Sequence, residues 1–449
     1  MNSRLINNFI KFDKKIISLN EKKIIELWFC IRYAVFYNHV SNKYFKNKKK
    51  TFFEYFKKFI FQFLQSIKII FFLFKRNEII EIDVGRYKIY DRKFNSTINH
   101  ILKKNKISFQ TISLSSNSKI LDNKINVIFF VNITHFFLKI FMKFRKKDFK
   151  DLSLIKKKFN LFFKNKKKID FLNIYKSIYL QQVAIFLVIK FFIKLFRSKK
   201  IIYMETANLS KLIQYCGKKS IETFDVQHSL ISNLNILYKF YISKNYKYLV
   251  TKNIIIWGKF WKKFYSNNSR CINIGYLEKK IQFNKIPKKK QIIIISSIYS
   301  RKYLIEILKF LSSNLKNYKI IYKLRPEENI ESLKSFIDFD KKNIVFLGKL
   351  SENELKQKIA QSEYVIGINS TLLIESIGIS NIIVYKKDWY KEYDFLIKKN
   401  VFLSAKNCIE ILSIINNKKK TANSIKKEEI FKKPKNNSLN NLINKNINA

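Results

Sequence analysis

The chain has 449 residues, enough for two or three domains, and its hydrophobic content of 47% excludes an intrinsically disordered protein. The net charge is +58, from 90 Lys and Arg against 32 Asp and Glu, and such a surface attracts anionic membranes, nucleic acids and nucleotides. Four scattered cysteines, no zinc-ligand spacing and no RNA-binding signature favour a reducing, cytoplasmic setting, without a metal site and without a specific nucleic-acid partner.

Residues 1–75 read as a basic, mostly helical N-terminal extension, with apolar residues at helical spacing over 19–40 and an aromatic stretch after them. Mixed charges over residues 1–25 argue against a secretory signal. Three apolar and basic stretches are candidates for membrane contact: 52–75, 126–144 and 177–196. The last is typical of a helix packed on a domain or lying in a membrane interface, and a true span is the least favoured interpretation.

Residues 76–280 alternate between helical segments and apolar strand segments, which predicts a doubly wound Rossmann-like α/β domain. The expected strands include 79–84, 124–131, 201–204 and 220–226, and a helix over 209–216 is expected to end at Gly217.

His228 follows the strand 220–226 directly, where ligand groups gather in such sheets, with Gln227 and Ser229 beside it. A histidine there can act as a general base, or can hold a phosphate or an acceptor hydroxyl. A structural role for His228 is the alternative.

Residues 281–290 are polar and basic and contain Pro287, so they are the expected linker. A second Rossmann-like domain is expected over 291–415, followed by a Lys/Asn-rich tail over 416–449. Ser297 and Arg325 stand at the carboxyl ends of two of its predicted strands. A guanidinium at that edge can clamp a diphosphate, although a surface arginine in a very basic protein is the plain alternative.

The central stretch of this domain, residues 362–384, predicts a strand, a tight turn, a helix ended by Gly378 and a second strand. Small polar residues at the turn suit an anion site, and a carboxylate one helical turn later can accept hydrogen bonds from a ribose. An ordinary helix cap with a solvated Glu is the alternative. The residues concerned are Asn369, Ser370, Thr371 and Glu375.

Four segments in this order, FDVQHSLIS, INIGYLE, YKLRPEE and SEYVIGINSTLLIESIG, resemble bacterial cell-surface glycopolymer transferases of the GT-B fold. This class includes capsule polysaccharide transferases and, more distantly, the glycerophosphotransferases of teichoic acid synthesis. The resemblance covers roughly residues 77–401. It departs from the family pattern at Ser229, where the family has Gly, and at Arg325, where the family has His.

The resemblance implies two Rossmann-like domains that face a cleft, with a nucleotide sugar on the C-terminal domain and a glycan or lipid-linked glycan acceptor on the N-terminal one. It implies no metal and no cofactor beyond the nucleotide-sugar co-substrate. The catalytic residue is then His228, and the donor-binding residues are Arg325, Ser370 and Thr371 at phosphate and Glu375 at the ribose. Gln227, Ser229, Ser297 and Asn369 are further residues of the cleft.

The function expected from these features is transfer of a sugar to a growing cell-surface polysaccharide, such as capsule or O-antigen. The enzyme would work in the cytoplasm, bound peripherally to the anionic inner face of the plasma membrane. A non-catalytic, membrane-associated scaffold of polysaccharide assembly is the main alternative. A nucleotide-sugar epimerase and a nucleic-acid-binding protein are weaker ones.

Overall fold

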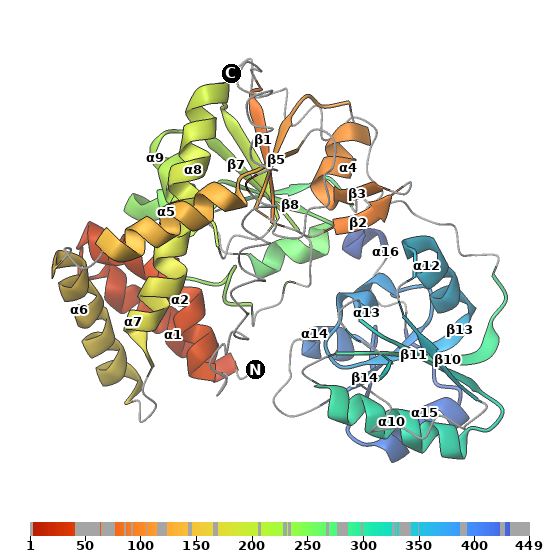
Figure 1. Ribbon diagram of the computed structural model, residues 1–449. Helices are drawn as coiled ribbons and strands as arrows, with labels where there is room; N and C mark the ends of the chain where they lie inside the picture. The colour runs from red at the N-terminus through yellow and green to blue at the C-terminus, as the bar shows by residue number, and fades with distance from the viewer. Residues whose placement is uncertain are drawn as a thin grey trace. The chain divides into compact units, whose positions relative to one another are not determined.

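The structure is a computed structural model in which the chain forms two compact units, from Ser3 to Glu278 and from Lys279 to Lys432. Each unit contains a parallel sheet covered by helices (Figure 1). The residues that the structure describes are 3–40, 63, 77–84, 87–90, 93–104, 106–114, 124–141, 146–164, 169–204, 208–227, 231, 235–265, 269–275, 286–297, 300–325, 328, 330–331, 343–348, 350–386, 393–422 and 427–431.

The N-terminal unit has a seven-stranded sheet of order β5-β4-β1-β6-β7-β8-β9, in which every described pair of neighbouring strands is parallel. Its strands are β1 (Ile79–Asp83), β4 (Gln110–Ser113), β5 (Lys124–Asn126), β6 (Lys200–Tyr203), β7 (Glu222–Val226), β8 (Asn253–Ile256) and β9 (Arg270–Asn273). An antiparallel pair, β2 (Tyr87–Tyr90) and β3 (Lys93–Ser96), stands apart from this sheet.

Helices cover both faces of this sheet because its strands are buried on both sides. Within the described residues, the helices that follow β3 are α4 (Thr97–Lys104), α5 (Ile128–Phe141), α6 (Lys146–Phe163), α7 (Phe171–Ile174), η3 (Tyr175–Tyr179), α8 (Leu180–Phe196), α9 (Ser210–Lys218), η4 (Lys244–Leu249) and η5 (Lys259–Phe264). Ile80 and Ile82 of β1 pack with α8 and α9, while Ile79 packs with α4 on the opposite face.

Two of these helices come from the stretches that the sequence marked for membrane contact. Within the described residues, Phe171–Phe196 is long and apolar enough to span a membrane by length and composition. Its α8 portion packs on the sheet through Ile185, Ile189 and Phe192, so the core-packing interpretation is confirmed. The predicted strand 124–131 is wrong beyond residue 126. The Asn126 carboxamide accepts a hydrogen bond from the Ile128 amide, and α5 begins there.

The N-terminal helices α1 (Ser3–Ile17) and α2 (Lys22–Val40) are part of this unit. They pack with α6 and, through α2, with α9 and η3. The buried aromatic rings of Phe9 and Phe12 form the centre of this packing, because each contacts both Trp28 of α2 and Phe159 of α6. Residues 3–40 of the segment expected as an extension therefore form part of the hydrophobic core of this unit.

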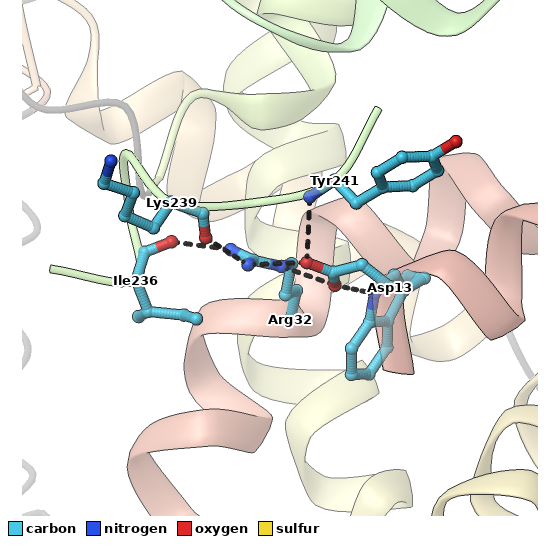
Figure 2. Close-up of polar contacts among 6 residues, drawn as sticks. Asp13, Arg32, Ile236, Lys239 and Tyr241 are labelled. Carbon is cyan, nitrogen blue, oxygen red and sulfur yellow. Dashed lines mark hydrogen bonds and ion pairs between the residues drawn. The ribbon is translucent and has the colours of Figure 1, made fainter. Parts of the chain in front are cut away.

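A buried ion pair joins these helices to the segment that follows β7 (Figure 2). Arg32 Nε and Nη2 each donate to one oxygen of the Asp13 carboxylate at 2.8 Å, and both side chains are almost fully buried. The same guanidinium donates to the carbonyl oxygens of Ile236 and Lys239, at 2.6 Å in each case. The Trp28 indole completes the arrangement by donating to Asp13.

The C-terminal unit has a six-stranded sheet of order β12-β11-β10-β13-β14-β15, again parallel at every described pair. Its strands are β10 (Lys289–Ile295), β11 (Lys319–Lys323), β12 (Ile344–Leu347), β13 (Ser362–Gly367), β14 (Asn381–Tyr385) and β15 (Leu403–Ala405). Its helices within the described ranges are α10 (Arg301–Asn314), α12 (Glu352–Gln361), α13 (Thr371–Glu375), α14 (Asp394–Ile397), α15 (Cys408–Asn416) and α16 (Lys427–Ile430).

Local signals in this unit agree with the structure. The Ser351 hydroxyl and the Glu354 carboxylate form a reciprocal capping box at the start of α12. Gly378 has a positive φ of 69°, as expected of a glycine after a helix. β10 begins at Lys289, inside the segment expected as the linker, and the proposed domain boundaries otherwise stay a prediction.

Gly217 has a different role from the predicted helix stop, because α9 continues to Lys218. A Cβ atom at Gly217 would lie 2.6 Å from the carbonyl oxygen of Tyr248 and 2.7 Å from its Cα. The glycine therefore lets η4 approach α9 backbone to backbone.

We expect Gly217→Ala to lower the free energy of unfolding by about 1–3 kcal/mol, because η4 or α9 must move to relieve the overlap. Urea denaturation measures the change. Gly348→Ala is the matched control, since nothing lies within 4 Å of a Cβ atom there. Equal effects of the two substitutions would contradict the close-approach explanation.

Candidate functional site

The order of strands in the C-terminal sheet marks one position as special. The chain runs from β10 to β11 and β12 on one side, and from β13 to β14 and β15 on the other. The connections therefore diverge between β10 and β13, and their carboxyl ends open a crevice in folds of this kind. We take this edge as the candidate site.

Ser297 lies at the centre of this edge. The register pairs Ile295 with Lys323 and Ile294 with Ile366, so Ser297 follows β10 between Arg325 on one side and Asn369 on the other. Its side chain is only 1% exposed, and its hydroxyl has no hydrogen-bond partner in the described part of the chain. An unsatisfied buried hydroxyl costs about 1–3 kcal/mol, so a ligand atom that pairs with it is favoured.

Arg325 follows β11 at the same level of the sheet, and only its backbone is engaged. Its amide donates to the Glu328 carboxylate at 2.8 Å. The guanidinium is half-buried and makes no ion pair or hydrogen bond with any described residue. A guanidinium in this state can take a phosphate in a bidentate way.

A neighbouring ion pair fixes the loop that carries Arg325. The Glu328 side chain is fully buried, and its Oε1 accepts a hydrogen bond from Arg301 Nε at 3.1 Å and forms an ion pair with Arg301 Nη2 at 3.0 Å. Arg301 is the first residue of α10, so the pair ties the loop after β11 to the helix after β10. Sequence reasoning missed both residues. The only signal was opposite charge in the two segments that follow adjacent strands.

The Ser370–Thr371 turn follows β13, and much of its polar capacity is used within the unit. The Ser370 hydroxyl accepts from the Leu372 amide at 3.3 Å and caps α13, which is only five residues long. The Tyr393 hydroxyl accepts from the Ser370 amide at 3.0 Å and donates to the Ser370 carbonyl at 2.6 Å. The turn is thus less open to an anion than the sequence suggested, although the Thr371 hydroxyl makes no hydrogen bond with a described residue.

The other predicted donor-site residues lie at the same edge. The Asn369 carboxamide accepts a long hydrogen bond of 3.5 Å from Ser300, just before α10. Glu375 is half-buried at the last position of α13, four residues after Thr371. Ser297, Arg325, Asn369 and the turn therefore belong to one sheet edge, with Glu375 on the helix behind it.

The predicted acceptor-side residues are described only in part, because His228 and Ser229 lie outside the described residues. Gln227 is buried, and its carboxamide oxygen accepts from the Trp257 amide at 3.0 Å. The Trp257 indole in turn donates to the Gln227 carbonyl at 2.7 Å. Gln227 thus joins the ends of β7 and β8, which is a structural task. A cleft shared by the two units stays a prediction.

Asp83 and Asp225 are two buried carboxylates near the carboxyl ends of the N-terminal sheet. Lys124 Nζ lies 2.7 Å from Asp83, and both side chains are buried. The Tyr238 hydroxyl donates to Asp225 at 3.1 Å. Burial, and next the Asp225 charge, raise the pKa of Tyr238 well above its usual value, so the phenol remains a proton donor.

No group of three His, Cys, Asp or Glu side chains within the described ranges is placed to hold a metal ion. The expected absence of a metal from the reaction remains a prediction.

Searches against known proteins found no matching family model and no matching curated protein. Among solved structures, the S. aureus MnaA–UDP co-structure is similar with a TM-score of 0.52 at 8% identity, over 83% of this chain and 97% of that one. The UDP-GlcNAc 2-epimerase from Neisseria meningitidis bound to UDP-GlcNAc gives 0.47 at 12% identity, over 83% and 100%. The glycotransferase of kitacinnamycin gives 0.45 at 5% identity, over 76% and 90%.

The likeness to MnaA, together with the two parallel sheets, confirms the predicted fold class. The chain is an α/β protein with two Rossmann-like domains of the GT-B type. Likeness at this level of identity shows the fold and leaves the substrate open.

Tyr393→Phe removes the hydroxyl that holds the Ser370 amide and carbonyl. We expect unfolding free energy to fall by about 1–3 kcal/mol and the Ser370 amide to exchange faster with solvent, because a buried hydrogen-bonded group loses its partner. Hydrogen exchange followed by mass spectrometry measures this. Tyr318→Phe is the control, since its hydroxyl donates to Glu363 at the amino ends of the strands. The role of the Tyr393 hydroxyl is refuted if both variants change the amide hydrogen exchange of residues 369–372 equally.

Proposed function

We propose that the chain is a glycosyltransferase that moves a sugar from a nucleotide donor to a growing cell-surface polysaccharide. The observation that carries this proposal is the pairing, at one sheet edge, of a buried Ser297 hydroxyl and an Arg325 guanidinium that both lack described partners. The edge lies at a topological switch point, where open α/β sheets bind ligands. The resemblance of four sequence segments to cell-surface glycopolymer transferases supports the choice of reaction.

The donor's diphosphate is the group that suits this edge. In the proposed arrangement Arg325 takes phosphate oxygens through two N–H groups, while Ser297 and Thr371 donate hydroxyl hydrogen bonds. Fixed positive charge then stabilises the diphosphate as it leaves. Glu375 accepts from the ribose, and the Arg301–Glu328 pair keeps the Arg325 loop in place.

His228 is the proposed base. It takes the proton from an acceptor hydroxyl, whose oxygen bonds to the anomeric carbon while the bond from that carbon to the diphosphate breaks. Arg325 replaces a histidine of the family pattern and stays protonated near neutral pH, so it serves charge stabilisation rather than proton transfer. The proposed acceptor is a glycan or a lipid-linked glycan.

A nucleotide is the ligand class with the best support, because the MnaA structure of the same fold was determined with UDP. An epimerase acting on a nucleotide sugar is the second candidate, and it needs acid–base carboxylates in the N-terminal unit. Asp83 and Asp225 are engaged by Lys124 and Tyr238, which favours structural roles for both. A scaffold without catalysis would bind no nucleotide at this edge.

Arg325→Ala should weaken UDP binding by about tenfold or more, because a charge-assisted hydrogen bond contributes about 1.5–3 kcal/mol. Ser297→Ala should weaken it by a smaller factor. Isothermal titration with UDP measures both. Lys319→Ala is the matched control, since it removes an exposed cation from the opposite end of the same strand, β11. If neither site variant differs from this control, the donor site lies elsewhere.

His228→Ala should abolish most sugar transfer while leaving UDP affinity within about twofold, since general-base catalysis contributes roughly 10²–10⁴-fold to the rate. The assay supplies UDP-sugars with membrane lipids as acceptor source and follows labelled product. NMR of the same UDP-sugars incubated with the protein, without acceptor, tests for epimerase activity. A new C2 epimer would overturn the transferase proposal, and so would unchanged transfer by both His228→Ala and Arg325→Ala.

A further inference from the structure

The exposed large hydrophobic side chains of the described residues are concentrated on two helices of the N-terminal unit. More than half of them lie on α5 and α8, and these helices contact each other (Figure 1). They are Phe130, Phe136, Phe137, Ile140 and Phe141 on α5, and Leu187 and Phe191 on α8. We call this set the α5–α8 apolar surface. Soluble monomers rarely expose aromatic side chains so densely, so this surface indicates an interaction site.

The α5 part of the surface is the more prominent. Phe136, Phe137 and Phe141 are 61%, 50% and 63% exposed, although α5 buries Phe129 and Val131 at its start. Phe137 and Phe141 are four residues apart and share a helix face with Phe130, seven residues before Phe137. Phe63 is also exposed, and its ring packs on that of the buried Phe129 at the start of α5, with 5.3 Å between the centroids.

The charges on these helices are of one sign. Neither α5 nor α8 contains an Asp or a Glu. Lys139 is exposed on α5, and Lys194 and Arg197 are exposed at the end of α8. Lys194 is seven residues after Leu187 and three after Phe191, so a cation continues the apolar stripe of α8. An apolar surface whose two helices carry cations and no anions is complementary to an anionic bilayer.

We propose that the α5–α8 apolar surface docks this protein on a membrane of anionic phospholipids, with the α5 aromatic side chains inserted below the headgroups and Lys139, Lys194 and Arg197 at the phosphates. The net charge of +58 argues against a second copy as the occupant, since two such basic surfaces repel each other. α5 has 14 residues, about 21 Å at 1.5 Å per residue, which is short of the roughly 30 Å hydrocarbon core, so it lies in the interface.

The side of α8 that faces the sheet shows that this helix does not span a membrane in this fold. Ile185, Ile189 and Phe192 are buried in the core of the sheet, so α8 cannot enter the bilayer without unfolding the unit. Docking by the outer surface keeps this core intact. It also brings the chain to the membrane at which a lipid-linked acceptor would be found, although the docking itself does not depend on the proposed transferase activity.

The test uses the full chain and flotation with vesicles of phosphatidylcholine alone or with phosphatidylglycerol. Phe136→Ser, Phe137→Ser and Phe141→Ser are combined in one variant. Ile409→Ser on α15 is the control, because Ile409 is 69% exposed in the C-terminal unit. We expect binding only to the anionic vesicles, about tenfold or more weaker for the triple variant and unchanged for the control. All substituted side chains are exposed, and urea unfolding verifies that the variants remain folded.

A second variant, Lys139→Glu with Lys194→Glu and Arg197→Glu, separates charge from insertion. This variant should bind the anionic vesicles roughly tenfold or more weakly than the wild-type protein. Added salt should weaken vesicle binding of the wild-type protein more than that of the variant. Light scattering without lipid gives the oligomeric state. Wild-type affinity in the triple serine variant would overturn the proposal. Equal binding to neutral vesicles, or a dimer that only the triple variant dissociates, would overturn it as well.

Discussion

The ion pair between Asp13 and Arg32 joins the first two helices to a segment that lies 204 residues beyond Arg32 in the sequence. Two charges removed from water carry a desolvation cost, and here that cost is offset by two hydrogen bonds between the charges, two backbone carbonyls and an indole N–H. Removing one partner of such a pair typically costs about 3–5 kcal/mol, because the other charge is left buried and alone. The arrangement therefore specifies one position of α1 and α2 against the segment that follows β7.

At the candidate binding edge of the C-terminal unit, other polar contacts hold the backbone in place. The loop after β11 is fixed by Arg301 and Glu328, and the turn after β13 is fixed by Tyr393. Both devices use polar groups from neighbouring elements to hold backbone, and they leave Arg325 and Ser297 without described partners. A rigid frame with a few uncommitted polar groups is the arrangement that favours binding of a charged ligand, since little freedom is lost when the ligand arrives.

Much of the fold could be predicted from local pattern. The strand, turn, helix and strand over 362–384 follow from apolar runs and Gly378, and the α12 cap follows from the spacing of Ser351 and Glu354. The boundary between β5 and α5 could not be predicted, since one apolar run serves both elements and only the Asn126 cap separates them. The Tyr393–Ser370 hydrogen bonds and the Arg301–Glu328 ion pair could not be predicted from local sequence, because each joins segments more than 20 residues apart.

The position of Arg32 has a practical consequence for the design of a shorter folded fragment. A chain trimmed to begin near residue 76 would keep every strand of both sheets, yet it would lack Arg32, Asp13 and Trp28. The carbonyls of Ile236 and Lys239 would then lose their donor, and the surfaces of α9 and η3 that α2 covers would meet water. The first two helices thus hold the segment of Ile236 and Lys239 in place, and a fragment that keeps this support must include Asp13.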